Sequence, residues 1–219
     1  MWILLFSLLS SLAGNIFGMI EGGGTQGAEI KFLALGDSYT IGESVAENER
    51  WPNQLANKLG ISKPLIIATT GWRTDNLENA ISIAKLKGEY DLVSLLIGVN
   101  NQYQGKPIDE YSLEFEMLLN TSIRLAKGKK ENVFVVSIPD YGFTPFGLKN
   151  KDQISLEIDQ FNEIAKKICY KVQVKYINIT DISREGLSDP SLVAPDGLHP
   201  SGKMYSLWAK RIAKAVTQK

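Results

Sequence analysis

Short apolar runs alternate along this chain with longer segments in which hydrophobic positions recur every three or four residues. The five apolar runs span residues 30–35, 65–68, 91–97, 132–138 and 174–178. Their lengths, and the scarcity of polar positions within them, are typical of strands that are buried on both faces of a sheet. We therefore expect five strands.

The segments between these runs have the spacing of amphipathic helices. One is expected to begin at Trp51, with Pro52 in its first turn, and to end at Gly60. Others are expected over residues 75–87 and within 108–128. In the longest segment the apolar residues recur at steps of four and three: Ile154, Ile158, Phe161, Ala165 and Ile168. A closing helix carries Met204, Trp208 and Ile212.

Strands that alternate with helices form βαβ units, in which the strands run parallel and the helices cover both faces of the sheet. The sequence therefore predicts an α/β fold, a flavodoxin-like three-layer α/β/α sandwich with a five-stranded parallel sheet.

The N-terminal segment differs from the rest, because residues 1–20 contain no charged side chain. Its Leu-rich core and the small residues up to Ala13 resemble a secretory signal peptide, and a membrane anchor is the alternative. The glycines at 22–24 indicate a flexible linker. We expect residues 1–24 to be a signal peptide or N-terminal anchor with this linker. Residues 25–219 are expected to form one secreted or periplasmic domain.

Composition excludes several classes of function. The chain has 24 Lys and Arg against 24 Asp and Glu, so no basic field indicates a nucleic-acid partner. One cysteine, Cys169, cannot form an intramolecular disulfide, and its place on an amphipathic helix indicates a structural thiol. One histidine and one cysteine are too few for a zinc site, so we expect no metal and no cofactor.

A serine follows the first expected strand directly, in the stretch Gly36-Asp37-Ser38. In open α/β sheets ligands bind at the carboxyl ends of the strands, which is where Ser38 is predicted to lie. A serine hydroxyl needs a base before it can act as a nucleophile. The chain contains a single histidine, His199, so we expect Ser38 and His199 to meet across the fold. The alternative for Ser38 is a helix N-cap.

Two further short blocks lie between these residues: Gly71 after the second run, and Gly98-Val99-Asn100 after the third. With Gly-Asp-Ser near one end and Asp196-Gly-Leu-His199 near the other, the ordered blocks resemble the GDSL or SGNH hydrolase family. The resemblance extends over residues 30–213 and implies a metal-independent serine esterase. It implies Ser38 as the nucleophile, and an oxyanion hole formed by the Ser38 and Gly71 N–H groups and the Asn100 amide.

His199 is expected to act as the general base and then as the acid that protonates the leaving group. Asp196 lies three residues before it, a spacing that lets its carboxylate reach one ring nitrogen. The family places its acid at the same offset, although an Asp-Gly pair is also an ordinary turn signal. Asp140 and Asp189 are further candidates for this acid.

The sequence departs from the family pattern at two positions. Tyr39 stands where the family shorthand has Leu, and Asn101 stands where an Asp commonly follows the oxyanion Asn. Neither change removes a reacting group, but the second leaves open how the loop of Asn100 is supported. The aromatic residues of 141–147 are expected either to line an acyl or sugar pocket or to cover the sheet edge.

The leading hypothesis is therefore a serine hydrolase that cleaves carboxylic esters through an acyl-enzyme intermediate. It would act on a small-molecule ester, a lipid or an acylated carbohydrate, deacetylation of sugars included. The alternatives are a non-catalytic ligand-binding domain with the same fold, or an acyltransferase that uses the same serine. The oligomeric state is left open.

Overall fold

Five parallel strands form the central sheet of the computed structural model, which describes residues 29–218. They are β1 (Phe32–Gly36), β2 (Leu65–Ala68), β3 (Leu92–Leu96), β4 (Val133–Val136) and β5 (Lys175–Ile177). Their order across the sheet is β2-β1-β3-β4-β5, and every neighbouring pair is parallel. Each strand overlaps one predicted apolar run. The predicted signal peptide and linker at 1–24 lie outside the described residues.

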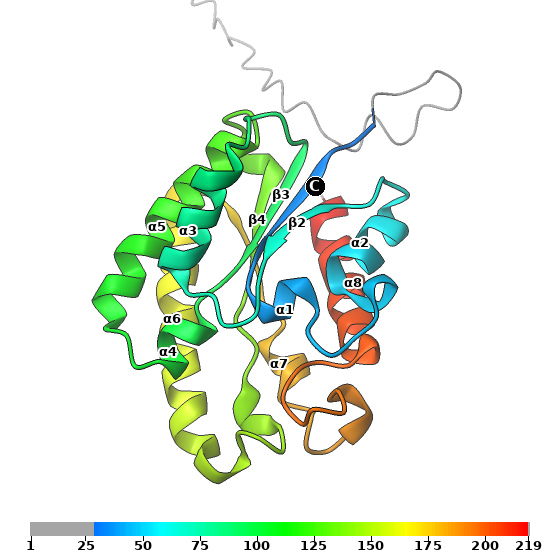
Figure 1. Ribbon diagram of the computed structural model, residues 1–219, viewed down its shortest axis with the longest axis vertical. Coiled ribbons are helices and arrows are strands. Elements are labelled where there is room, and N and C mark those ends of the chain that lie inside the picture. Colours follow the sequence, from blue (N-terminus) through cyan, green and yellow to red (C-terminus); the bar gives the residue numbers. More distant parts are fainter. Residues whose placement is uncertain (1–28, 219) are drawn as a thin grey trace, which may run out of the picture.

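Helices cover both faces of this sheet (Figure 1). On one face α2 (Trp51–Leu59) packs against α8 (Gly202–Thr217). On the other lie α3 (Thr74–Ala84), α5 (Ile108–Leu125) and α6 (Lys151–Val172). The predicted three-layer α/β/α sandwich with its five-stranded parallel sheet is therefore confirmed. Among the helices at 29–218, none is long and apolar enough to cross a membrane.

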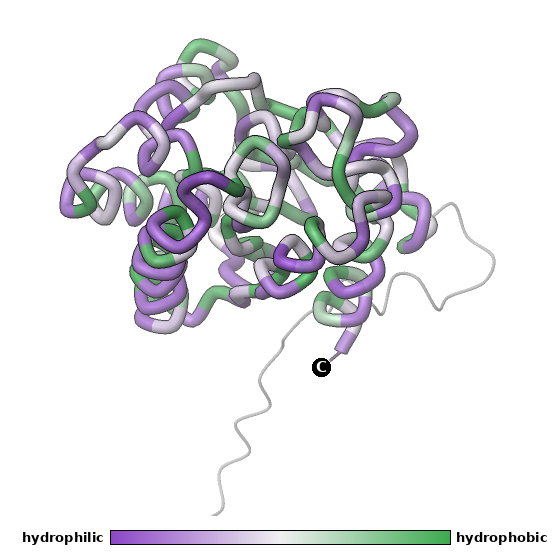
Figure 2. Tube along the Cα trace, turned by 90° about the horizontal axis from the view of Figure 1, so that it is seen from below, coloured by the Kyte–Doolittle hydropathy of each residue, from purple (hydrophilic) through white to green (hydrophobic). Residues whose placement is uncertain are grey.

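Burial follows the sequence pattern. Every residue of β1, β3 and β4 is buried, whereas β2 and β5, at the edges of the sheet, are partly exposed. In α6 the buried face contains all five residues of the predicted apolar stripe. Viewed from below, hydrophilic and hydrophobic positions alternate around the helical turns, as expected for helices with one face on a sheet (Figure 2).

The local differences from prediction lie at helix ends and in short elements. The helix predicted over 75–87 ends at Ala84, because Lys85 takes a left-handed conformation with φ 48° and breaks the ladder. Three short helices were not predicted: α1 (Ser38–Ile41), α4 (Val99–Tyr103) and α7 (Thr180–Ser183). Elements of four or five residues are too short to show a hydrophobic period.

Single 3-10 turns occupy several of the connections: Glu47–Glu49, Lys130–Asn132, Tyr141–Phe143, Leu148–Asn150 and Pro190–Leu192.

Candidate active site

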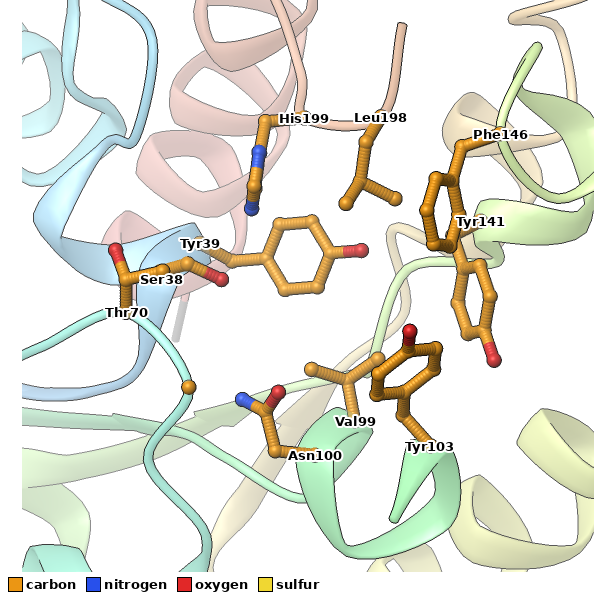
Figure 3. A pocket seen from close by; sticks show the side chains of 11 residues that line it. Ser38, Tyr39, Thr70, Val99, Asn100, Tyr103, Tyr141, Phe146, Leu198 and His199 are labelled. Carbon is orange, nitrogen blue, oxygen red and sulfur yellow. The ribbon is translucent and has the colours of Figure 1, made fainter. Parts of the chain in front are cut away.

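The carboxyl ends of β1, β2 and β3 bring the predicted blocks to one edge of the sheet. Ser38 opens α1 directly after β1, Gly71 lies in the loop after β2, and Asn100 lies in α4 after β3. His199 reaches the same edge from the loop that precedes α8. All four residues line one cavity of about 260 Å³ (Figure 3). The convergence expected from the order of the strands is therefore observed.

The first turn of α1 places Ser38 at the cavity. Its N-cap is Asp37, whose Oδ1 accepts a hydrogen bond from the Tyr39 N–H at 3.0 Å. The alternative that Ser38 is the N-cap is therefore wrong, because Asp37 caps this helix. Ser38 is the first helical residue and lines the cavity. Its side chain is left without a capping role.

Asp37 is completely buried, and its Oδ2 has no hydrogen-bond partner among residues 29–218. Burial raises the pKa of Asp37 to about 7, against the hydrogen bonds from the Tyr39 N–H and its own backbone N–H, which lower it. The hydrogen bond that its side chain does form, from the Tyr39 N–H, lies in the first turn of α1.

The loop before α8 joins the imidazole to a carboxylate. Nδ1 of His199 lies 2.6 Å from Oδ2 of Asp196. Oδ1 of Asp196 accepts hydrogen bonds from the N–H groups of Leu198 at 2.9 Å and His199 at 3.0 Å. The predicted turn and the predicted histidine contact therefore occur together. Oδ1 of Asp196 accepts the hydrogen bonds of the turn, and Oδ2 contacts the imidazole.

This contact determines the roles of the two ring nitrogens. An ionised carboxylate only accepts hydrogen bonds, so Nδ1 of His199 carries the proton and Nε2 of the neutral ring is an acceptor. Figure 3 shows the far end of the imidazole directed toward the side of the cavity where Ser38 lies. Within residues 29–218 Ser38 has no side-chain hydrogen bond to His199. Such bonds are often long before substrate binds.

A residue that the sequence did not single out also holds Asp196. The hydroxyl of Ser44 donates to Oδ2 of Asp196 at 2.5 Å. Burial alone would raise the pKa of Asp196. Hydrogen bonds from Ser44, the Leu198 N–H and His199 outweigh it and hold that pKa well below its usual range. Ser44 follows no motif, so no sequence signal could have indicated this contact.

Three potential donors to an anion surround the cavity near Ser38. The Asn100 amide donates to the Trp72 carbonyl at 2.9 Å, which fixes its plane, and its tip points toward Ser38 (Figure 3). Gly71 has φ 84°, a left-handed conformation that favours glycine. The first N–H groups of a helix have no intrahelical acceptor, so the amide of Ser38 at the start of α1 is available as well.

Asn101 answers the question of how the Asn100 loop is supported. Its buried side chain accepts a hydrogen bond from the Thr74 N–H at 3.1 Å and donates to Thr74 Oγ1 at 2.6 Å. Because a side-chain amide both donates and accepts, its oxygen and its nitrogen each form one hydrogen bond that joins α4 to the start of α3. The departure from the family pattern therefore leaves the loop anchored.

The other acidic candidates are occupied elsewhere. Oδ2 of Asp140 lies 2.9 Å from Nε of Arg184, and Oδ2 of Asp189 lies 2.7 Å from Nζ of Lys203. Neither forms a hydrogen bond with His199 among the described residues. Of the three predicted carboxylates, only Asp196 pairs with the histidine.

Aromatic side chains form much of the remaining lining. Tyr141 and Phe146, from the stretch 141–147, line the cavity together with Tyr103. Tyr39 also lines it and packs edge-on against the His199 ring, with 5.7 Å between ring centroids. Two of the aromatic residues of 141–147 therefore line the cavity, whereas Phe143 does not, and Tyr141 is also part of the hydrophobic core. Tyr39 therefore contacts the proposed base, which the sequence did not indicate.

Elsewhere in residues 29–218 no group of three or more His, Cys, Asp and Glu side chains is placed to hold a metal ion. Cys169 is fully buried in α6, and burial raises the pKa of its thiol to about 12. A buried thiol with a raised pKa is expected to react slowly.

The comparisons with solved structures agree with this fold. A G-D-S-L family lipolytic protein from Veillonella parvula superposes with a TM-score of 0.67 at 18% identity, covering 87% of this chain and all of that one. The acetylxylan esterase Axe2 of Geobacillus stearothermophilus superposes with a TM-score of 0.66 at 19% identity, covering 92% and 97% of the two chains. At these identities the likeness is one of fold.

Sequence comparisons extend over most of the chain. The uncharacterised protein YpmR of Bacillus subtilis (strain 168) is 24% identical over 235 residues, covering 98% of this chain and 92% of its own length. The model of the GDSL-like lipase/acylhydrolase family matches residues 34–207. This protein therefore belongs to the GDSL-like lipase/acylhydrolase family and is in general terms a hydrolase that acts on esters.

Proposed function

We propose that this protein cleaves carboxylic esters through an acyl-enzyme intermediate, with Ser38 as the nucleophile. His199 would act as the general base and acid, and Asp196 would orient it. The observation that carries the proposal is the 2.6 Å contact between Asp196 and His199 at the cavity that Ser38 lines. A protein that only bound a ligand would have no need of a proton acceptor held at the same cavity as a serine.

Acylation begins when Ser38 Oγ attacks the ester carbonyl carbon while its proton passes to Nε2 of His199. The new Oγ–C bond converts the carbonyl oxygen to an oxyanion. Collapse of this intermediate breaks the bond to the alcohol oxygen, which takes the proton from His199 and leaves. Asp196 remains ionised throughout and stabilises the imidazolium.

Deacylation repeats these steps with water. His199 Nε2 removes a proton from the water as its oxygen attacks the acyl carbon, and it returns that proton to Ser38 Oγ as the acid leaves. In both halves the oxyanion would be met by the N–H groups of Ser38 and Gly71 and the amide of Asn100. Loss of one such donor typically lowers the rate by about 10²–10³.

The test uses a fluorophosphonate probe on the purified protein, with intact mass and peptide mapping. We expect one adduct, on Ser38, and none in Ser38→Ala or His199→Ala. A panel of esters then measures turnover, and adding an alcohol acceptor shows whether the acyl group is transferred or hydrolysed. A folded protein that takes no adduct and hydrolyses no ester would instead be a binding domain, and the proposal would fail.

Deacetylation of sugars is one substrate class within this proposal, since Axe2 is named as an acetylxylan esterase. The lining and the size of the cavity favour a different class, esters of short acyl chains.

A further inference from the structure

The cavity beside Ser38 has two unlike sides. On one side the lining is polar, since Thr70 is exposed there, and its hydroxyl donates to the carboxylate of the partly exposed Glu43 behind it. On the other side Val99 and Leu198 face each other across the cavity and lead away from Ser38 toward a group of rings (Figure 3). An ester bound at Ser38 would meet both sides.

The rings form a wall that we call the aromatic wall: Tyr103, Tyr141 and Phe146. Their centroids lie 6.1–6.3 Å apart in all three pairings, so the rings support one another. The Tyr141 hydroxyl donates to Oε1 of Gln102 at 2.9 Å, which turns it out of the cavity. What Tyr141 presents to the cavity is therefore its ring.

Part of this wall is exposed. Tyr103 is 58% exposed and Phe146 is 52% exposed, although both are large hydrophobic residues. Exposed apolar surface gathered at the mouth of a cavity marks a place where an apolar group binds. The side chains of Val99, Leu198 and Phe146 carry no polar atom, so the polar side-chain groups on this side are the tyrosine hydroxyls. The hydroxyls of a sugar would find few partners here.

The size of the cavity limits the group that it holds. At about 260 Å³ it lies just under the range of about 300–1,000 Å³ for pockets that take drug-sized ligands. Since a water-sized group takes about 30 Å³, the cavity holds about eight such groups, the ester included. A short chain would fill it, a methyl group would leave it mostly empty, and a long lipid tail would extend out of it.

We propose that the aromatic wall binds the acyl group, and that this protein prefers esters of linear acyl chains of about four to six carbons. The inference rests on the proposed function. The alcohol would lie on the side of Thr70 and Glu43, where hydroxyl groups find partners. Each methylene buried against the wall raises kcat/KM about fourfold until the cavity is filled.

The first measurement is kcat/KM for p-nitrophenyl esters from acetate to palmitate, each divided by its rate of hydroxide hydrolysis. The alcohol is constant in this series, so only the acyl side varies. We expect a maximum between butyrate and hexanoate. A maximum at acetate would overturn the inference, as would a continued rise to palmitate or a clear preference for acetylated xylooligosaccharides.

The second measurement uses Phe146→Ala. Its hexanoate-to-acetate ratio of kcat/KM should fall about tenfold, because the buried acyl chain loses its contact with the ring. Leu148→Ala is the matched control, because Leu148 is 53% exposed and lies two residues further on, outside the cavity. Tyr103→Ala repeats the test from α4, in case the first variant does not fold. An unchanged ratio in both Phe146→Ala and Tyr103→Ala would show that the wall does not contact the acyl group.

Labelling of Ser38 by the fluorophosphonate separates two kinds of failure. A labelled Ser38 with acetate as the best substrate would overturn the acyl preference and leave the proposed function standing. An unlabelled, folded protein without esterase activity would overturn both.

Discussion

Ser44 and His199 bond the same oxygen atom of Asp196. Oδ2 lies 2.5 Å from Ser44 Oγ and 2.6 Å from His199 Nδ1. Ser44 follows α1, the helix that Ser38 opens, so this contact joins the segment of the proposed nucleophile to the loop of the proposed base. Its φ of 65° is uncommon for a residue other than glycine, and the surrounding structure holds it there.

Replacing Ser44 by glycine removes the hydroxyl and tolerates the positive φ. We expect kcat/KM to fall about tenfold, because a net hydrogen bond to a charged group contributes about 1.5–3 kcal/mol, part of which water restores. The acid limb of the pH profile of kcat/KM should move to higher pH, because the charge of Asp196 is then shared with fewer donors. In an Asp196→Ala background the same substitution should have no further effect. An effect of equal size there would show that Ser44 does not act through Asp196.

Asn100→Ala should lower kcat by about 10²–10³ with little change in KM, because an oxyanion donor acts mainly in the transition state. The substitution also removes the bond from Asn100 to the Trp72 carbonyl. Gln104→Ala controls for this, since Gln104 Nε2 donates to the Gly71 carbonyl at 3.3 Å and does not line the cavity. A similar loss of kcat in the control would assign the effect to loop anchoring.

The buried Asp37 makes stability depend on pH. Its pKa of about 7 in the folded protein lies above the ordinary value of 3.8, so folding favours the protonated form. The contribution is fully present below pH 3.8 and is lost as the pH rises through 7. Between pH 5 and pH 8 we expect the free energy of unfolding to fall by about 2–3 kcal/mol from this group. Urea denaturation at the two pH values measures it, and Asp37→Asn should reduce the difference. If the free energy of unfolding changed equally between the two pH values in both proteins, the pH dependence would not come from Asp37.

Cys169 should not react with iodoacetamide in the folded protein, because its thiol is buried and its pKa is raised to about 12. Mass spectrometry of the treated protein checks this expectation, and a labelled Cys169 would contradict it.

Ester hydrolysis should be unaffected by a chelator, and an ester assay after the treatment checks this. Activity that is lost with the chelator and returns with added metal would contradict the metal-independent mechanism.

The fold was predictable because buried parallel strands leave a strong signal. The runs that became β1, β3 and β4 are mostly apolar, and motif residues follow two of these strands. Topology then brings residues 38 and 199 to one edge without any local signal of their proximity. The signal peptide, the domain boundary at residue 25 and the roles of the site residues stay predictions.

What the sequence could not show depends on contacts between distant residues. Ser44 lies 152 positions from Asp196, and no composition or period marks such a pair. Tyr39 was set aside because its side chain takes no part in the chemistry, yet its ring packs against His199. The capping role of Asp37 depends on a helix of four residues, which is too short to be recognised from its pattern.

The Phe146 N–H donates to the Gly197 carbonyl at 3.0 Å, and Gly197 lies in the loop of Asp196 and His199. Tyr103 shares α4 with Asn100, and Leu198 precedes His199 directly. The side chains that would choose the substrate are thus carried on the same segments as those that would transform it. Substitutions at these positions that favour a new acyl group would therefore also shift the residues expected to transfer the proton. Specificity and rate in this protein are therefore expected to evolve together.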